Sequence, residues 1–144
     1  MAEGKVFSSP DAAVSDVFDG AALLVGGFAS GGLPESLIRS LLEKDVGDLT
    51  CIFSGDSRLD GVPGVYDVSR LVENGQVRKL ISPLPFYPGS GGVIEQRLAA
   101  GELEIEVIPQ GVLAERLRAG GVGLGGIFLS AGIGTRFEQG KETR

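Results

Sequence analysis

The stretch from Asp19 to Pro34, D-G-A-A-L-L-V-G-G-F-A-S-G-G-L-P, constrains the fold more than any other part of this sequence. Three apolar residues, 23–25, are typical of a short buried strand, and the glycines that follow let the backbone turn sharply. Pro34 suits the first position of a helix. Residues 35–44 then place apolar side chains on one helical face. The stretch therefore predicts a strand, a glycine loop and a helix in direct succession.

A second apolar run, residues 49–53, follows that helix and completes a strand–helix–strand unit. Such units have parallel strands joined by a right-handed crossover. Further strands are expected at residues 77–81 and 102–108, with helices before and after them. We therefore expect an α/β fold with three layers and a mainly parallel sheet. A chain of 144 residues is most simply a single domain, residues 1–144.

The glycine loop has the features of an anion-binding site. The first amides of a helix have no partner within the helix and carry the positive end of its dipole, which favours a phosphate, a carboxylate or a developing oxyanion. The alternative is that the glycines only let the strand and the helix pack closely. The standard nucleotide-binding patterns do not fit. The loop has no Lys-Ser/Thr pair, and Phe28 and Ala29 stand where the dinucleotide pattern needs glycine.

The absence of histidine excludes more chemistry than any residue present suggests. Ser-His and Cys-His nucleophile pairs and histidine metal sites all need one, so we expect no hydrolase triad and no metal. The only cysteine, Cys51, lies in an apolar run and is expected to be a buried, inert thiol rather than a nucleophile. A net charge of -6 argues against nucleic acid as a partner. No apolar run is long enough for a membrane span, so the cytoplasm is the expected location.

Two groups of charged residues leave alternatives open. Three glutamates alternate with apolar residues along the last predicted strand: Glu102, Glu104 and Glu106. They indicate a strand with one solvated side, although carboxylates on one face could also serve as an acid and a base. Arg116 and Arg118 on the last helix could pair with Glu115 and Glu102 or meet an anionic ligand.

Several motifs together carry a resemblance to a known family. Asp19-Gly20 is followed by two residues, three apolar residues, Gly26-Gly27-Phe28, three residues, and Gly32-x-Pro34. Downstream come I-P-Q-G-V-L-A-E-R-L-R-A-G-G at 108–121 and A-G-I-G-T at 131–135. These motifs resemble, in the same order, the α subunit of family I CoA-transferases of the acetate/3-oxoacid type. In that subunit the chain continues well beyond this point, so the sequence is similar to its N-terminal part.

The resemblance implies a function. Such enzymes move CoA between an acyl-CoA, for example succinyl-CoA or acetyl-CoA, and a 3-oxoacid or short-chain acid, through a glutamate that the β subunit supplies. It therefore implies a β partner in a heterodimer or heterotetramer, CoA as a substrate with no tightly bound cofactor, and no catalytic residue in this chain. The coenzyme-binding segment would be the whole glycine loop: Gly26, Gly27, Phe28, Ala29, Ser30, Gly31 and Gly32.

Two other functions remain open beside CoA transfer. Water could take the acceptor's place, which would make the protein a CoA-ester hydrolase on the same scaffold. The chain could also be a noncatalytic CoA-binding or assembly module, since it lacks a nucleophile.

Two further features of the sequence bear on the structure. The apolar, glycine-rich stretch at residues 120–134 needs other residues to cover it, which indicates an interface. Ala29 stands where relatives often have glycine, so a positive φ there would be strained.

Overall fold

A four-stranded parallel sheet organises the chain in the computed structural model, which describes residues 6–29, 31–55 and 63–142. Its strands lie side by side in sequence order: β1 (Ala22–Val25), β2 (Leu49–Phe53), β3 (Val77–Ser82) and β4 (Glu104–Val107). The helices are α1 (Pro10–Ala13), α2 (Glu35–Glu43), α3 (Val68–Glu73), α4 (Val93–Ala99) and α5 (Gln110–Gly121), followed by the 3-10 turn η1 (Arg136–Glu138). The expected α/β class with a parallel sheet is confirmed.

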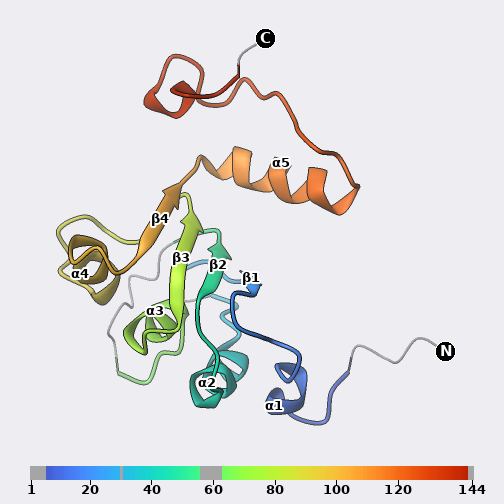
Figure 1. Ribbon diagram of the computed structural model, residues 1–144, viewed down its shortest axis with the longest axis vertical. Coiled ribbons are helices and arrows are strands. Elements are labelled where there is room, and N and C mark those ends of the chain that lie inside the picture. Colours follow the sequence, from blue (N-terminus) through green and yellow to red (C-terminus); the bar gives the residue numbers. More distant parts are fainter. Residues whose placement is uncertain (1–5, 30, 56–62, 143–144) are drawn as a thin grey trace.

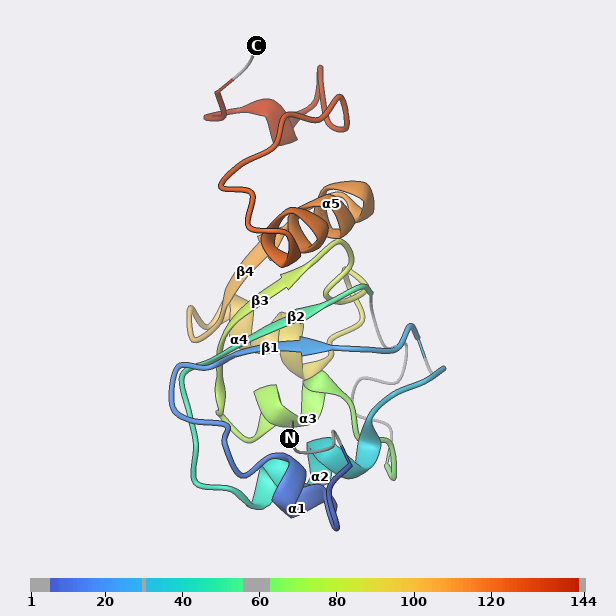
Figure 2. The same ribbon diagram turned by 90° about the vertical axis from the view of Figure 1, so that its right-hand side faces the viewer.

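The helices form two unequal layers. Helices α1, α2, α3 and α4 lie next to one another in chain order and cover one face of the sheet (Figure 1). A sheet wound in sequence order by crossovers of one hand must place its crossover helices on the same side. Figure 2 shows α5 on the other side of the sheet from α1 and α2. Among the elements that the structure describes, the third layer of the expected fold therefore consists of α5 alone.

The core lies between the sheet and the larger helical layer. One row of paired strand residues faces it: Leu23, Cys51, Leu80 and Ile105. Cys51 and Leu80 are fully buried, and Ile38 and Leu71 reach them from α2 and α3. Burial of these side chains supplies the main free energy that holds the helices on the sheet.

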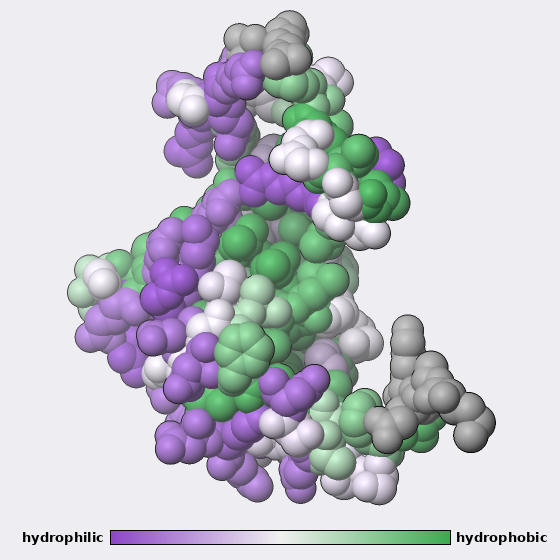
Figure 3. Space-filling model, turned by 45° about the vertical axis from the view of Figure 1, so that its right-hand side comes forward, coloured by the Kyte–Doolittle hydropathy of each residue, from purple (hydrophilic) through white to green (hydrophobic). Residues whose placement is uncertain are grey.

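The opposite face of the sheet is less covered. Leu24 lies one residue along β1 from the core row and is 62% exposed. Ile52 and Ile81, its neighbours across the sheet, are half-buried. Figure 3 shows apolar surface between α5 and the lower helices. Within the described residues, no helix is both long and apolar enough to cross a membrane.

Side chains from neighbouring elements fix the ends of the first helices. Lys44 donates from Nζ to the carbonyl oxygens of Val14, Ser15 and Val17 at 2.9, 2.7 and 2.6 Å. These bonds provide a donor for backbone carbonyl groups just after the end of α1. Gln76 likewise donates from Nε2 to the Leu41 oxygen at 2.8 Å near the end of α2. These bonds hold the chain ahead of β1 and β2, so that both strands start from fixed positions.

Candidate functional site

The glycine loop, residues 26–34, joins β1 to α2 and folds back on itself. The amide of Phe28 donates to the Gly31 oxygen at 3.0 Å, and the amide of Gly31 donates to the Phe28 oxygen at 2.9 Å. Gly27 has φ +101°, and a Cβ there would lie 3.1 Å from the oxygens of Gly31 and Gly32. Gly32 also has a positive φ, +70°. The tight turn therefore requires glycine at positions 27 and 32.

This loop is fastened to the loop after β2. Ser54 donates from Oγ to the oxygen of Gly27 at 3.0 Å. The ring of Phe28 lies over Gly55, where a Cβ would be only 2.8 Å from the ring edge, although the Phe28 side chain as a whole is 66% exposed. Because β1 and β2 are parallel neighbours, their carboxyl ends meet at one edge of the sheet, where ligands bind in such folds. The two loops therefore lie side by side at this edge, where the structure describes the second loop up to Gly55.

Backbone donors gather at the same edge. The pairing of Phe28 with Gly31 uses two amides of the loop. In the part of the chain that the structure describes, the amides of Gly26, Gly27, Ala29 and Gly32 donate to no protein acceptor. These amides are available to an anion.

The helix that follows contributes less to this site than the sequence suggests. It begins at Glu35, with Pro34 as its N-cap and no capping side chain, so Pro34 lies one position before the first helical residue. The carboxylate of Glu35 in the first turn partly satisfies the positive end of the helix dipole. Anion binding at this edge therefore depends mainly on the amides of the loop.

Two of the expected site residues need separate mention. Ala29 has φ +50°, so the strain expected for a residue other than glycine at this position is present. Ser30 lies outside the described residues. The other residues of the predicted coenzyme-binding segment all lie in this loop. Gly26, Gly31 and Gly32 are exposed to solvent.

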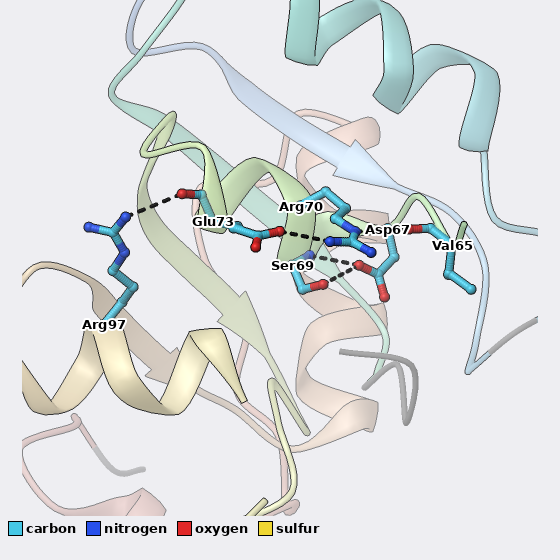
Figure 4. Close-up of polar contacts among 6 residues, drawn as sticks. All are labelled: Val65, Asp67, Ser69, Arg70, Glu73 and Arg97. Carbon is cyan, nitrogen blue, oxygen red and sulfur yellow. Dashed lines mark hydrogen bonds and ion pairs between the residues drawn. The ribbon is translucent and has the colours of Figure 1, made fainter. Parts of the chain in front are cut away.

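A small hollow lies beneath the loop, and sequence reasoning missed the carboxylate that lines it. The backbones of Gly26, Gly27 and Gly55 contribute to its wall together with Asp67, whose side chain is buried at 3% exposure. Asp67 caps α3, and its Oδ1 accepts from the amide of Ser69 at 3.0 Å and from the Ser69 hydroxyl (Figure 4). Its position before a short helix indicates a cap, but nothing local to the sequence indicates burial.

The glutamates of β4 are held in ion pairs. Lys79 Nζ lies 2.8 Å from Glu104 and 3.5 Å from Glu106, and Arg116 lies 2.7 Å from Glu106. The hydrogen bond from Arg116 is the largest cause that holds the pKa of Glu106 below its usual range. Arg97 pairs with Glu102. These carboxylates therefore form a charged, ion-paired edge rather than an acid and base pair.

The other candidate side chains are structural. Arg118 pairs with Glu115 at 2.6 Å, as one alternative expected, whereas Arg116 reaches Glu106 instead of Glu102. Burial raises the pKa of the Cys51 thiol to about 12, which leaves it unreactive. Among the residues placed by the structure, no group of three His, Cys, Asp or Glu side chains could hold a metal ion.

Comparison with known proteins gives a consistent picture. The family model described as "Coenzyme A transferase" matches residues 7–144. One subunit of the probable succinyl-CoA:3-ketoacid coenzyme A transferase of Bacillus subtilis is 40% identical over 96% of this chain and 55% of its own length. The alpha subunit of the acetate CoA-transferase of Escherichia coli is 38% identical over 87% of this chain and 53% of its own. The chain thus spans about half the length of the curated relatives that it matches.

A solved structure supports the fold assignment. An acyl-CoA transferase from Escherichia coli O157:H7, solved as a thioester complex with CoA, superimposes with a TM-score of 0.69. It is 25% identical in sequence, and the match covers 88% of this chain and 25% of that one. The parallel sheet and the layer of helices on its one face therefore have a counterpart in a protein solved with CoA.

Proposed function

This chain belongs to the coenzyme A transferase family, and from that membership we propose that it is the α part of an acyl-CoA:carboxylate CoA-transferase. In this proposal CoA moves between an acyl-CoA, such as succinyl-CoA or acetyl-CoA, and a 3-oxoacid or short-chain acid. The reaction takes place in the cytoplasm. The observation that carries the proposal is the glycine loop with unpaired amides at the carboxyl edge of the sheet, in a chain whose relatives are named as parts of CoA-transferases.

The proposed role of this chain is to bind and orient the coenzyme. A glutamate supplied by the β subunit would attack the thioester carbon, which gives an acyl-glutamyl anhydride and releases CoA as its thiolate. Amides of the loop, from Gly26, Gly27, Ala29 and Gly32, would donate to the thioester oxygen as negative charge develops on it. CoA is a substrate in this scheme. No side chain of this chain forms or breaks a bond.

A partner follows from the same proposal. Each of the two relatives is named as one subunit of its enzyme, which implies a second subunit in those enzymes. For this chain we propose a β subunit that carries the glutamate, in a heterodimer or heterotetramer. Exposed apolar side chains at Val122, Leu124, Phe128 and Ile133 provide surface that an interface could bury.

The test is reconstitution with a β subunit. The chain is co-expressed with the second subunit of a relative's CoA-transferase, and CoA exchange is measured between succinyl-CoA and acetoacetate. Gly27→Ala is compared with Gly47→Ala, whose Cβ would meet nothing within 4 Å and which lies away from the loop. We expect exchange in the wild type and the Gly47 variant and its loss in the Gly27 variant. Release of CoA without an acceptor would instead indicate a hydrolase, and CoA binding without turnover a noncatalytic module.

A further inference from the structure

Strand β1 lies at one end of the sheet but lacks the features of an edge strand. Among the described residues it pairs only with β2, so its other edge has no hydrogen-bonded neighbour (Figure 1). Natural edge strands usually carry charged residues or proline, which discourage pairing with a further strand. Strand β4, at the other end of the sheet, carries Glu104 and Glu106. The sequence of β1 is Ala-Leu-Leu-Val, with neither feature. The free edge of β1 can therefore accept another strand.

The face of the sheet opposite to helices α1–α4 is also incompletely covered. Leu24 on this face is 62% exposed, and its neighbours Ile52 and Ile81 are half-buried. These three side chains define the open face. Purely parallel sheets almost always have helices on both faces, yet α5 is the only α-helix on this side among the described residues. The open face over β1 and β2 therefore fits a further helix.

The hand of the crossovers relates the free edge to the open face. Helices α2, α3 and α4 connect strands that follow one another from β1 to β4, and all three helices lie on one face of the sheet. Right-handed crossovers that add strands in the opposite direction, outward from β1, place their helices on the opposite face. That face is the open one. A single strand–helix arrangement would therefore cover both exposed parts of β1.

We propose that the free edge of β1 and the open face bind a strand and a helix from the part of the relatives' subunit that this chain does not span. The match covers 55% of the Bacillus subtilis subunit and 53% of the Escherichia coli subunit, so nearly half of each lies outside it. The added strand makes β1 central and places the glycine loop where the strand order reverses, the usual position of a ligand crevice. This interface is additional to the one proposed for the β subunit.

The reactivity of an introduced thiol tests the assignment. Leu24→Cys places a thiol on the open face, and Leu98→Cys is the matched control on α4, in the other helical layer, where Leu98 is 39% exposed. The native Cys51 is fully buried, so a maleimide reports on the introduced thiol. Each variant of the full chain is labelled alone, as a fusion to the unmatched part of the Bacillus subtilis subunit, and after co-expression with that part as a separate chain.

We expect both thiols to react readily in the chain alone. In the fusion and in the co-expressed complex, labelling of the Leu24→Cys variant should become at least about tenfold slower, as burial of that position predicts, while the Leu98→Cys variant is unchanged. The inference is wrong if the Leu24→Cys variant remains reactive in both forms, or if both variants are slowed equally.

Two other occupants of the open face give distinct results, and either would overturn the inference. Protection of the Leu24→Cys variant alone that increases with protein concentration would indicate a second copy of this chain. Protection by the second subunit of a relative's CoA-transferase, without the unmatched part, would indicate that subunit. The labelling requires no turnover, so a failure of the proposed function would appear separately, as an absence of CoA exchange.

Discussion

Gly26 and Gly27 are adjacent in the loop, but only one of them needs to be glycine. Gly27 has φ +101° and no room for a Cβ, whereas a Cβ at Gly26 would meet nothing within 4 Å. We expect Gly27→Ala to lower the free energy of unfolding by about 1–3 kcal/mol, the usual cost of a strained backbone. Gly26→Ala should change it by less than about 0.5 kcal/mol. Urea unfolding of both variants checks this, and equal losses would contradict the loop geometry.

Ala29 presents the reverse case, because it carries a side chain at φ +50°. The left-handed conformation costs a residue with a Cβ about 1–2 kcal/mol. Glycine would remove that cost but would lose about 0.5–1 kcal/mol through the greater entropy of the unfolded chain. We therefore expect Ala29→Gly to raise the free energy of unfolding by up to about 1 kcal/mol, again by urea unfolding. A loss of stability in this variant would mean that the strain is absent.

At the scale of elements, α5 is joined to the sheet by charge. Arg116 on α5 pairs with Glu106 on β4, and this pair holds the pKa of Glu106 below its usual range. A carboxylate with a lowered folded pKa contributes stability above its unfolded value of 4.5 and loses it as the pH falls through the folded value. We therefore expect the protection of α5 amides from hydrogen exchange, corrected for intrinsic rates, to decrease below pH 4.5.

Substitutions can test the pair of Glu106 and Arg116 separately from the pair of Glu115 and Arg118 within α5. Because the pair is partly exposed, Glu106→Gln at neutral pH should reduce α5 protection by only about two- to fivefold. Glu115→Gln is the matched control, since it removes the pair with Arg118 within α5 and no bond to the sheet. If both variants had the same effect, the pair of Glu106 and Arg116 would not be what docks the helix.

The elements could largely be predicted from the sequence, since local patterns determine them. Short, mainly apolar runs predict strands at residues 23–25 and 49–53, and both lie in observed strands. The glycine loop and its strained Ala29 also followed from local pattern and from the resemblance. The contacts that the loop makes could not be predicted from the sequence, because the pairing of Phe28 with Gly31 and the packing of Phe28 over Gly55 depend on tertiary geometry. The burial of Asp67 was missed for the same reason.

At the scale of the whole molecule, the sheet has one covered face and one partly open face. The alternating pattern at residues 102–108 predicted a single solvated side for that strand, but β1 gave no such signal, because both of its faces carry apolar residues. Leu23 faces the core while Leu24 is 62% exposed. An apolar run cannot distinguish a strand buried on both sides from one that exposes half of its side chains.

The asymmetry of the sheet leads to a comparison of two leucines. Leu80 is fully buried in the core row of β3, and Leu24 lies on the open face of β1. Leu80→Ala leaves a cavity and should lower the free energy of unfolding by about 2–5 kcal/mol. Leu24→Ala removes a side chain already in contact with water and should cost less than about 1 kcal/mol. Both values come from urea unfolding of the free chain, and similar losses for the two variants would mean that the second face is covered as well as the first.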